Sequence, residues 1–196
     1  TFFLHRMSVG DYVKALRSSG STMLAAAPTL MLAVPMVQVF LNSASESYSS
    51  MPIVLAEGVA SVTGQAWPFF APMIGAMGAF VAGSNTISNM MFSLFQFSAA
   101  EQIGLGAGGA ALVVALQAIG GAAGNMICVH NVVAASATVG LIGREGAIIR
   151  KTLIPMGYYV VQGGLIGTAL IAGGLNVWWI AAIVWAAGVL TVMAMN

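Results

Sequence analysis

The chain has 196 residues, of which 59% are hydrophobic and another 24 are glycine, whereas only 6% are charged. A water-soluble domain usually has about 25% charged residues, so this chain could not present a polar surface to water. The composition therefore predicts an integral membrane protein. A net charge of +1 provides no basic field for nucleic acid, and the single cysteine, Cys128, excludes an internal disulfide and a thiolate metal cluster.

The start of the chain has neither an initiator methionine nor the basic-then-apolar order of a signal peptide. We therefore expect a fragment of a longer protein, with an N-terminal portion missing. All cationic residues fall in two groups, within residues 6–17 and 144–151. By the positive-inside rule both groups lie in the cytoplasm, so an even number of membrane crossings separates them.

Three uncharged runs predict transmembrane helices, over residues 20–41, 153–173 and 177–195. Each run is close to the roughly 20 residues that an α-helix needs to cross a hydrocarbon core of about 30 Å. Two pairs of glycines, Gly120 with Gly124 and Gly163 with Gly167, have the four-residue spacing that permits close approach of helices.

Two polar interruptions divide the apolar sequence between these runs, at residues 83–89 and 124–131. The segments that flank the first interruption are too short to cross a bilayer comfortably. We therefore predict a re-entrant hairpin over residues 66–104, with its turn at membrane depth. Residues 106–143 then form one broken transmembrane helix, which gives the required parity of crossings.

Broken helices cannot face lipid, because each unsatisfied backbone amide or carbonyl would cost several kcal/mol there. The breaks must therefore line protein or a water-filled cavity. This pattern is typical of secondary transporters built from inverted repeats, in which the N-terminal ends of discontinuous helices face an anionic substrate. The predicted fold class is an all-α, polytopic integral membrane protein.

The side chains at the two interruptions are candidates for substrate binding. They offer hydroxyl and amide donors to a carboxylate, and no lysine or arginine lies among them. We also expect Ser88 or Asn89 to cap the helix that follows the first turn. The alternative for the first interruption is a polar turn at the membrane surface. The candidate substrate-binding residues are Ser84, Asn85, Thr86, Ser88, Asn89, Asn125 and Asn131.

Two side chains are candidates for proton coupling. His130 lies at predicted membrane depth, and a histidine ordinarily titrates near physiological pH, which suits a proton relay. Its alternative role is structural, as a neutral ring that hydrogen-bonds the broken backbone. Glu57 lies in an apolar stretch, where it is either a solvated carboxylate or a buried proton carrier.

The runs over residues 83–97 and 120–135, with the following Gly143-Arg144-Glu145-Gly146, closely resemble the bacterial L-lactate permease family. The resemblance covers the whole chain as a C-terminal portion. It implies proton-coupled uptake of L-lactate, with glycolate and related 2-hydroxy acids as further substrates. The triplet Ser84-Asn85-Thr86 also resembles the hairpin-tip motif of the wider ion-transporter superfamily, in which two such tips hold a carboxylate and coupling ions.

The predicted function is therefore proton-coupled symport of L-lactate and related 2-hydroxy monocarboxylates across the bacterial plasma membrane. Its partners are the substrate, protons, the lipid bilayer and the missing N-terminal portion, and association into a homo-oligomer is left open. A transporter of another organic anion coupled to sodium, a channel and a membrane-assembly subunit remain alternatives. We predict no cofactor and no metal site. We also predict no catalytic residue, because no nucleophile, base and orienting group occur together.

Overall fold

The structure is a computed structural model that describes residues 7–195, apart from some side chains between residues 22 and 34. The chain divides into two compact units, residues 1–38 and 39–196. Helix α1, Val9–Leu41, makes up most of the described part of the first unit and contains the predicted transmembrane run. The Ser8 hydroxyl accepts a hydrogen bond from the Asp11 amide at 3.1 Å, which caps the start of the helix.

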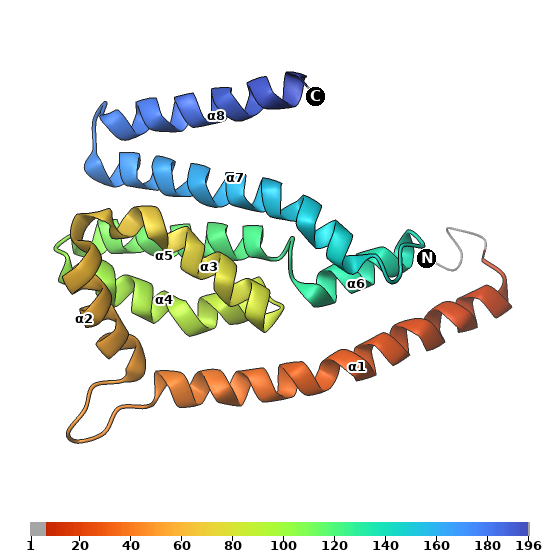
Figure 1. Ribbon diagram of the computed structural model, residues 1–196. Helices are drawn as coiled ribbons and strands as arrows, with labels where there is room; N and C mark the ends of the chain where they lie inside the picture. Colours follow the sequence, from red (N-terminus) through yellow and green to blue (C-terminus); the bar gives the residue numbers. More distant parts are fainter. Residues whose placement is uncertain (1–6, 196) are drawn as a thin grey trace. The chain divides into compact units, whose positions relative to one another are not determined.

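The second unit is helical throughout, and no strand occurs among residues 7–195. This confirms the predicted all-α class. Its elements are α2 (Met51–Thr63), a 3-10 turn (Gly64–Ala66), α3 (Trp67–Ala82), α4 (Asn85–Gln102), α5 (Gly106–Gly124), α6 (Val129–Thr138), α7 (Glu145–Ala172) and α8 (Val177–Met195), shown in Figure 1.

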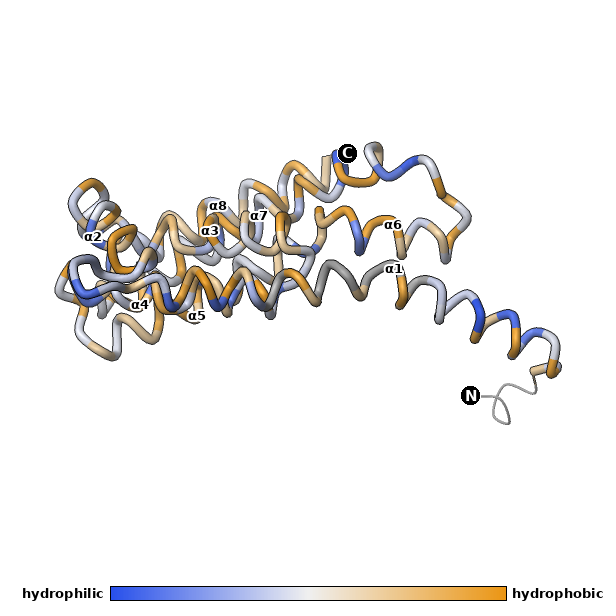
Figure 2. Tube along the Cα trace, turned by 90° about the horizontal axis from the view of Figure 1, so that it is seen from below, coloured by the Kyte–Doolittle hydropathy of each residue, from blue (hydrophilic) through white to orange (hydrophobic). Residues whose placement is uncertain are grey.

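Helices α5, α7 and α8 are the candidate membrane spans of the described residues, because each is long and apolar enough to cross a bilayer. Only 6% of the apolar window of α8 is buried inside the fold, so its hydrophobic side chains need an apolar environment outside this unit. Figure 2 shows hydrophilic positions only as short stretches along the tube. Arg150 and Lys151 lie in the second turn of α7. These features agree with an integral membrane protein.

Helices α3 and α4 form an antiparallel hairpin with a turn of only two residues. Gly83 ends α3 with a φ of 73°, a left-handed conformation that favours glycine, and its amide bonds the Ala79 carbonyl at 2.9 Å. The next residue, Ser84, caps α4, and its hydroxyl accepts from the Ile87 amide at 3.4 Å. The expectation that Ser88 or Asn89 caps this helix is therefore wrong, because the left-handed glycine lets α4 begin directly after Ser84.

Small residues allow helix α5 to lie directly against its neighbours. A Cβ on Gly120 would overlap the Pro72 carbonyl oxygen of α3, and one on Gly124 would overlap that of Ala76. On the other side of α5, a Cβ on Gly167 of α7 would overlap the Leu116 side chain. The glycine spacing thus marks real sites of close helix packing, as the sequence predicts.

The base of the hairpin is held by an apolar cluster that also includes α2. Ala56 of α2, Trp67 of α3, and Phe95 and Ala99 of α4 belong to this cluster, and the Trp67 and Phe95 rings meet edge to face with centroids 5.5 Å apart. Helix α2 therefore packs at the end of the hairpin opposite the Gly83 turn (Figure 1).

Candidate functional site

The tip of the α3–α4 hairpin carries the first set of predicted site residues. Ser84 and Asn85 are half-buried there, and Thr86 is exposed. The Asn85 side-chain oxygen accepts a hydrogen bond from the Asn89 amide group one turn later, at 3.3 Å. Because α4 begins at Asn85, the predicted polar turn consists mostly of the first turns of a helix.

The second interruption is a short break between α5 and α6. It covers residues 125–128 rather than 124–131, because α6 already begins at Val129. Part of the backbone in the break stays paired, since the Met126 amide bonds the Ala123 carbonyl at 3.1 Å and the Ile127 amide bonds that of Gly124 at the same distance. Such pairing lowers the cost of a broken helix in an apolar environment.

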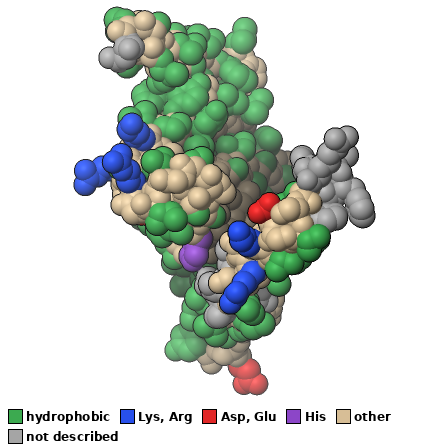
Figure 3. Space-filling view, turned by 90° about the vertical axis from the view of Figure 1, so that its right-hand side faces the viewer, with side chains coloured by type: hydrophobic (Ala, Val, Ile, Leu, Met, Phe, Trp, Pro, Cys, Tyr) green, Lys and Arg blue, Asp and Glu red, His purple; other side chains and the backbone are tan. Residues whose placement is uncertain are grey.

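His130 and Asn131 lie in the first turn of α6, and both side chains are exposed. The Asn131 amide group donates to the Asn125 carbonyl at 3.3 Å, which ties the start of α6 to the break. The His130 ring nitrogen Nδ1 lies 3.8 Å from the sulfur of the buried Cys128. Figure 3 looks onto this end of the second unit and shows a histidine side chain at its surface.

The structure brings the hairpin tip and the break together. A Cβ built on Gly83 would lie 2.8 Å from His130 Nδ1 and 3.5 Å from Cys128 Sγ. A Cβ on Gly121 of α5 would overlap the Asn85 side-chain oxygen. The tip therefore rests on the last turn of α5 and on the start of α6, and we call this place the tip–break junction.

The tip–break junction combines two helix starts with polar side chains. Helices α4 and α6 both begin there, and each helix start carries the equivalent of about half a positive charge. Two amide oxygens of the junction, Asn89 Oδ1 and Asn125 Oδ1, are buried without a hydrogen-bond partner among the described residues. The described residues hold no group of three histidine, cysteine or acidic side chains that could bind a metal ion. The junction thus offers positive helix ends and free amide oxygens.

Ser88 lies deeper than the other candidates. Its side chain is fully buried, its hydroxyl donates to the Gly75 carbonyl of α3 at 2.9 Å, and it accepts from Gln117 of α5 at 3.0 Å. Gln117 and its neighbour Gln96 are fully buried polar residues that the sequence analysis missed. The signal that could have revealed them is a lone amide within an apolar helix, since polar groups at membrane depth are rare.

The structure does not bring the two proton-coupling candidates together. Glu57 is exposed on α2, which packs at the base of the hairpin, whereas His130 lies at its tip. Helix α4 separates these ends by 18 residues, or roughly 27 Å at 1.5 Å per residue.

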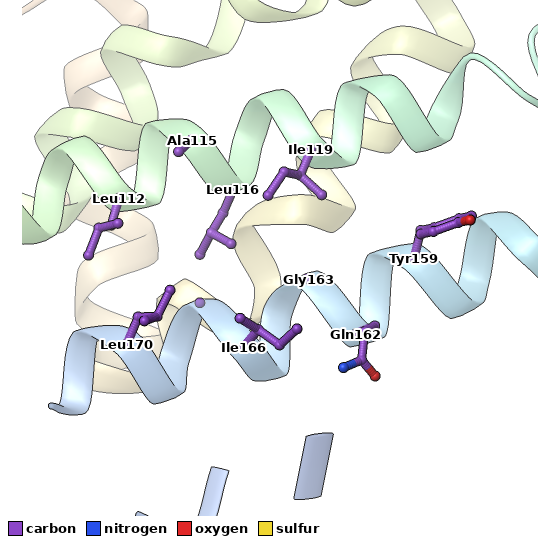
Figure 4. A pocket seen from close by; sticks show the side chains of 10 residues that line it. Leu112, Ala115, Leu116, Ile119, Tyr159, Gln162, Gly163, Ile166 and Leu170 are labelled. Atoms are coloured by element: carbon purple, nitrogen blue, oxygen red, sulfur yellow. The ribbon is translucent and has the colours of Figure 1, made fainter. Parts of the chain in front are cut away.

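A groove of about 360 Å³ lies between α5 and α7 and is shown in Figure 4. Its walls are almost entirely apolar, with Leu116 and Ile119 on one side and Ile166 and Leu170 on the other. The Gln162 side chain points away from α5 in this view. A groove with these walls does not suit a hydrophilic anion, so the tip–break junction is the better candidate site.

The fold and the junction define an all-helical integral membrane protein with discontinuous helices, an architecture typical of secondary transporters. The family model described as L-lactate permease matches residues 1–172. The chain belongs to the L-lactate permease family. This confirms the resemblance found in the sequence.

Several relatives support this assignment. A putative L-lactate permease of Haemophilus influenzae is 43% identical over 116 residues, which cover 59% of this chain and 21% of the relative. The L-lactate permease of Escherichia coli K12 is 35% identical over 140 residues, covering 71% of this chain and 24% of the relative. The glycolate permease of the same strain is 38% identical over 107 residues, covering 55% and 18%. The matches thus span less than a quarter of these relatives, and no solved structure matches the chain.

Proposed function

We propose that the protein acts in the proton-coupled symport of L-lactate, and of related 2-hydroxy monocarboxylates such as glycolate, across the bacterial plasma membrane. Family membership and the names of the relatives, which include L-lactate and glycolate permeases, support the substrate class. Because the relatives are much longer, we propose that the described helices work together with a further, N-terminal portion that supplies the second half of the substrate site.

The observation that carries this proposal is the meeting of the hairpin tip with the break between α5 and α6. Two helix starts face the junction, and an anion can be held there by helix dipoles and hydrogen bonds without a lysine or arginine. In this proposal Ser84, Asn85 and Thr86 bind the carboxylate from the tip, and Asn125 and Asn131 bind it from the break.

Ser88 and Asn89 have supporting parts in the proposed site. The Ser88 hydroxyl on α4 donates to Gly75 of α3 and accepts from Gln117 of α5, and Asn89 donates to Asn85. We therefore assign Ser88 to holding the hairpin together and Asn89 to orienting the Asn85 amide.

We assign the proton to His130. Its ring is exposed in the first turn of α6 and lies beside the hairpin tip, so a proton there would be close to the bound carboxylate. Uptake of one proton with one monoanion would be electroneutral. Glu57 is the second candidate, and its exposed position at the hairpin base makes it the weaker one.

The test is uptake of labelled L-lactate by the full-length protein in proteoliposomes under an inward proton gradient. We expect saturable uptake that collapses when a protonophore is added. Replacement of the tip amide, Asn85→Ala, should raise KM for lactate at least tenfold, whereas Gln102→Ala, an exposed amide at the far end of α4, should leave it unchanged. An unchanged KM in Asn85→Ala would refute the proposed binding of the substrate carboxylate at the hairpin tip.

Sodium coupling is a second candidate, and one observation favours it. Asn89 Oδ1 and Asn125 Oδ1 are buried and have no hydrogen-bond partner among the described residues. In transporters with discontinuous helices, carbonyl oxygens freed from helix bonding coordinate the coupling cation, and amide oxygens offer the same kind of ligand. The same proteoliposomes distinguish the two ions. Uptake that depends on a sodium gradient and is unaffected by the protonophore would support sodium coupling. It would refute the assignment of the proton to His130.

A further inference from the structure

A chain of buried hydrogen bonds joins the three helices behind the hairpin tip. The Gln96 amide group of α4 donates to the Ala71 carbonyl of α3 at 3.1 Å and to Gln117 Oε1 of α5 at 3.0 Å. The Gln117 amide group donates in turn to Ser88 Oγ at 3.0 Å, and Ser88 donates to the Gly75 carbonyl. Gln96, Gln117 and Ser88 each have no exposed surface. We call these three residues the polar ladder.

The direction of every bond in the polar ladder is fixed by its neighbours. Ser88 donates its only hydroxyl proton to a backbone carbonyl, so it must accept from Gln117. The Gln117 amide group therefore donates to Ser88, and the side-chain oxygen of Gln117 accepts from Gln96. Gln96 must donate to that oxygen and to the Ala71 carbonyl, and its own oxygen has no partner among the described residues. Neither glutamine side chain can be turned over without losing bonds.

The polar ladder is close to the tip without being part of it. The Ser88 backbone amide bonds the carbonyl of Ser84, the capping residue at the tip, at 3.0 Å. Gly75 and Gly78 make room for the ladder, because a Cβ on Gly75 would overlap the Gln117 carbonyl and one on Gly78 would overlap Ser88 Oγ. Any shift of the hairpin along α5 would break bonds of fully buried polar groups, and a buried polar group that loses its partner is costly.

We propose that Gln96 and Gln117 are positioning residues that hold the α3–α4 hairpin in register on α5 and thereby keep its tip seated on the start of α6. Since both side chains are sealed from the surface, they act through Ser88 and the tip and do not touch the substrate. The consequence for lactate rests on the proposed function, but the position of the tip can be measured without it.

Cys128 provides a natural reporter of the tip position. Its thiol is fully buried, and a Cβ on Gly83 at the tip would lie 3.5 Å from the sulfur. A tip that leaves its seat would uncover this thiol. The rate at which N-ethylmaleimide alkylates Cys128, followed by mass spectrometry of its peptide, therefore reports how firmly the tip is seated.

The experiment compares alkylation of Cys128 in the full-length protein in membrane vesicles. We expect Gln117→Leu and Gln96→Leu to raise the rate at least fivefold, because each removes links between the hairpin and α5. Gln162→Leu is the matched control, since Gln162 is a half-buried amide on α7 outside the polar ladder, and its rate should stay within twofold of the unmodified protein.

A conservative replacement separates positioning from simple packing. In Gln117→Glu the carboxyl group can accept from Gln96 in either protonation state. It can donate to Ser88 only while it carries a proton. The alkylation rate, divided by that of the unmodified protein at the same pH, should therefore be near one at low pH and should rise at high pH. A defect of side-chain volume alone would not change with pH.

The proposal is overturned if the leucine variants alkylate within twofold of the unmodified protein, or if the Gln117→Glu ratio is independent of pH. Should Gln117→Leu be absent from the membrane, Gln96→Leu and Gln117→Glu decide the question in the same way. Faster alkylation in the variants, together with no lactate uptake by the unmodified protein, would support the positioning role and refute the proposed function. Unchanged alkylation with intact lactate uptake would refute the positioning role alone.

Discussion

The substitution Gly121→Ala tests whether Asn85 binds the substrate, because it adds one carbon atom beside the Asn85 side chain. A Cβ at this position would overlap the Asn85 side-chain oxygen and lie 3.1 Å from its Cγ, while the nearest backbone atom, the Gly75 oxygen, is 3.7 Å away. The clash is therefore with the far end of a side chain, which can move by on the order of 1 Å to reach normal contact. That movement also breaks the 3.3 Å bond between Asn89 and Asn85.

The expected effects on folding and on binding differ. Folding should change by no more than about 1 kcal/mol, because the side chain yields and alanine is the better helix former by about that amount. Lactate binding should suffer far more, since a displacement of about 1 Å in a positioned group can cost roughly 100-fold. We therefore expect KM for lactate to rise about tenfold to 100-fold while the amount of folded protein stays constant.

The assay is saturable uptake of labelled L-lactate in proteoliposomes, together with thermal unfolding of the same preparation in detergent. Gly108→Ala is the matched control, because Gly108 lies on the same helix and a Cβ there meets no atom within 4 Å. If Gly121→Ala raises KM no more than Gly108→Ala does, Asn85 does not bind the substrate and the site at the tip–break junction is refuted.

Three further substitutions have expected outcomes. In Gly120→Ala the new Cβ would meet the backbone of Pro72, which cannot yield as a side chain does. We therefore expect the free energy of unfolding to fall by about 1–3 kcal/mol relative to Gly108→Ala. An unchanged melting temperature would contradict the packing argument. His130→Gln should leave exchange of labelled for unlabelled lactate intact but remove the response of net uptake to a protonophore, and retention of that response would exclude His130 as the proton site. Glu57→Gln should leave coupled uptake unchanged, because Glu57 is exposed at the hairpin base, and loss of coupling would transfer the proton assignment to Glu57.

Much of the fold could be predicted from local sequence. The scarcity of charge indicated a membrane protein, and the polar run between two apolar segments indicated a hairpin, because hydropathy and length alone decide whether a helix can cross lipid. The glycine pair at Gly120 and Gly124 predicted close packing, which the contacts with α3 confirm. The exact start of α4 was predicted wrongly, since several residues of the run are good helix caps and only the left-handed Gly83 selects Ser84.

The arrangement of the site was decided by tertiary structure. Gly83 and His130 are distant in the sequence. They meet because the hairpin packs against the small residues of α5, and α6 begins just after α5 ends. The pairing of Gln96 with Gln117, and the separation of Glu57 from His130, have the same origin. Local sequence determined which helices form and where they break, since those depend on neighbouring residues. The contacts between the breaks depend on packing between helices that are far apart in the chain. Local sequence therefore does not predict which breaks face each other.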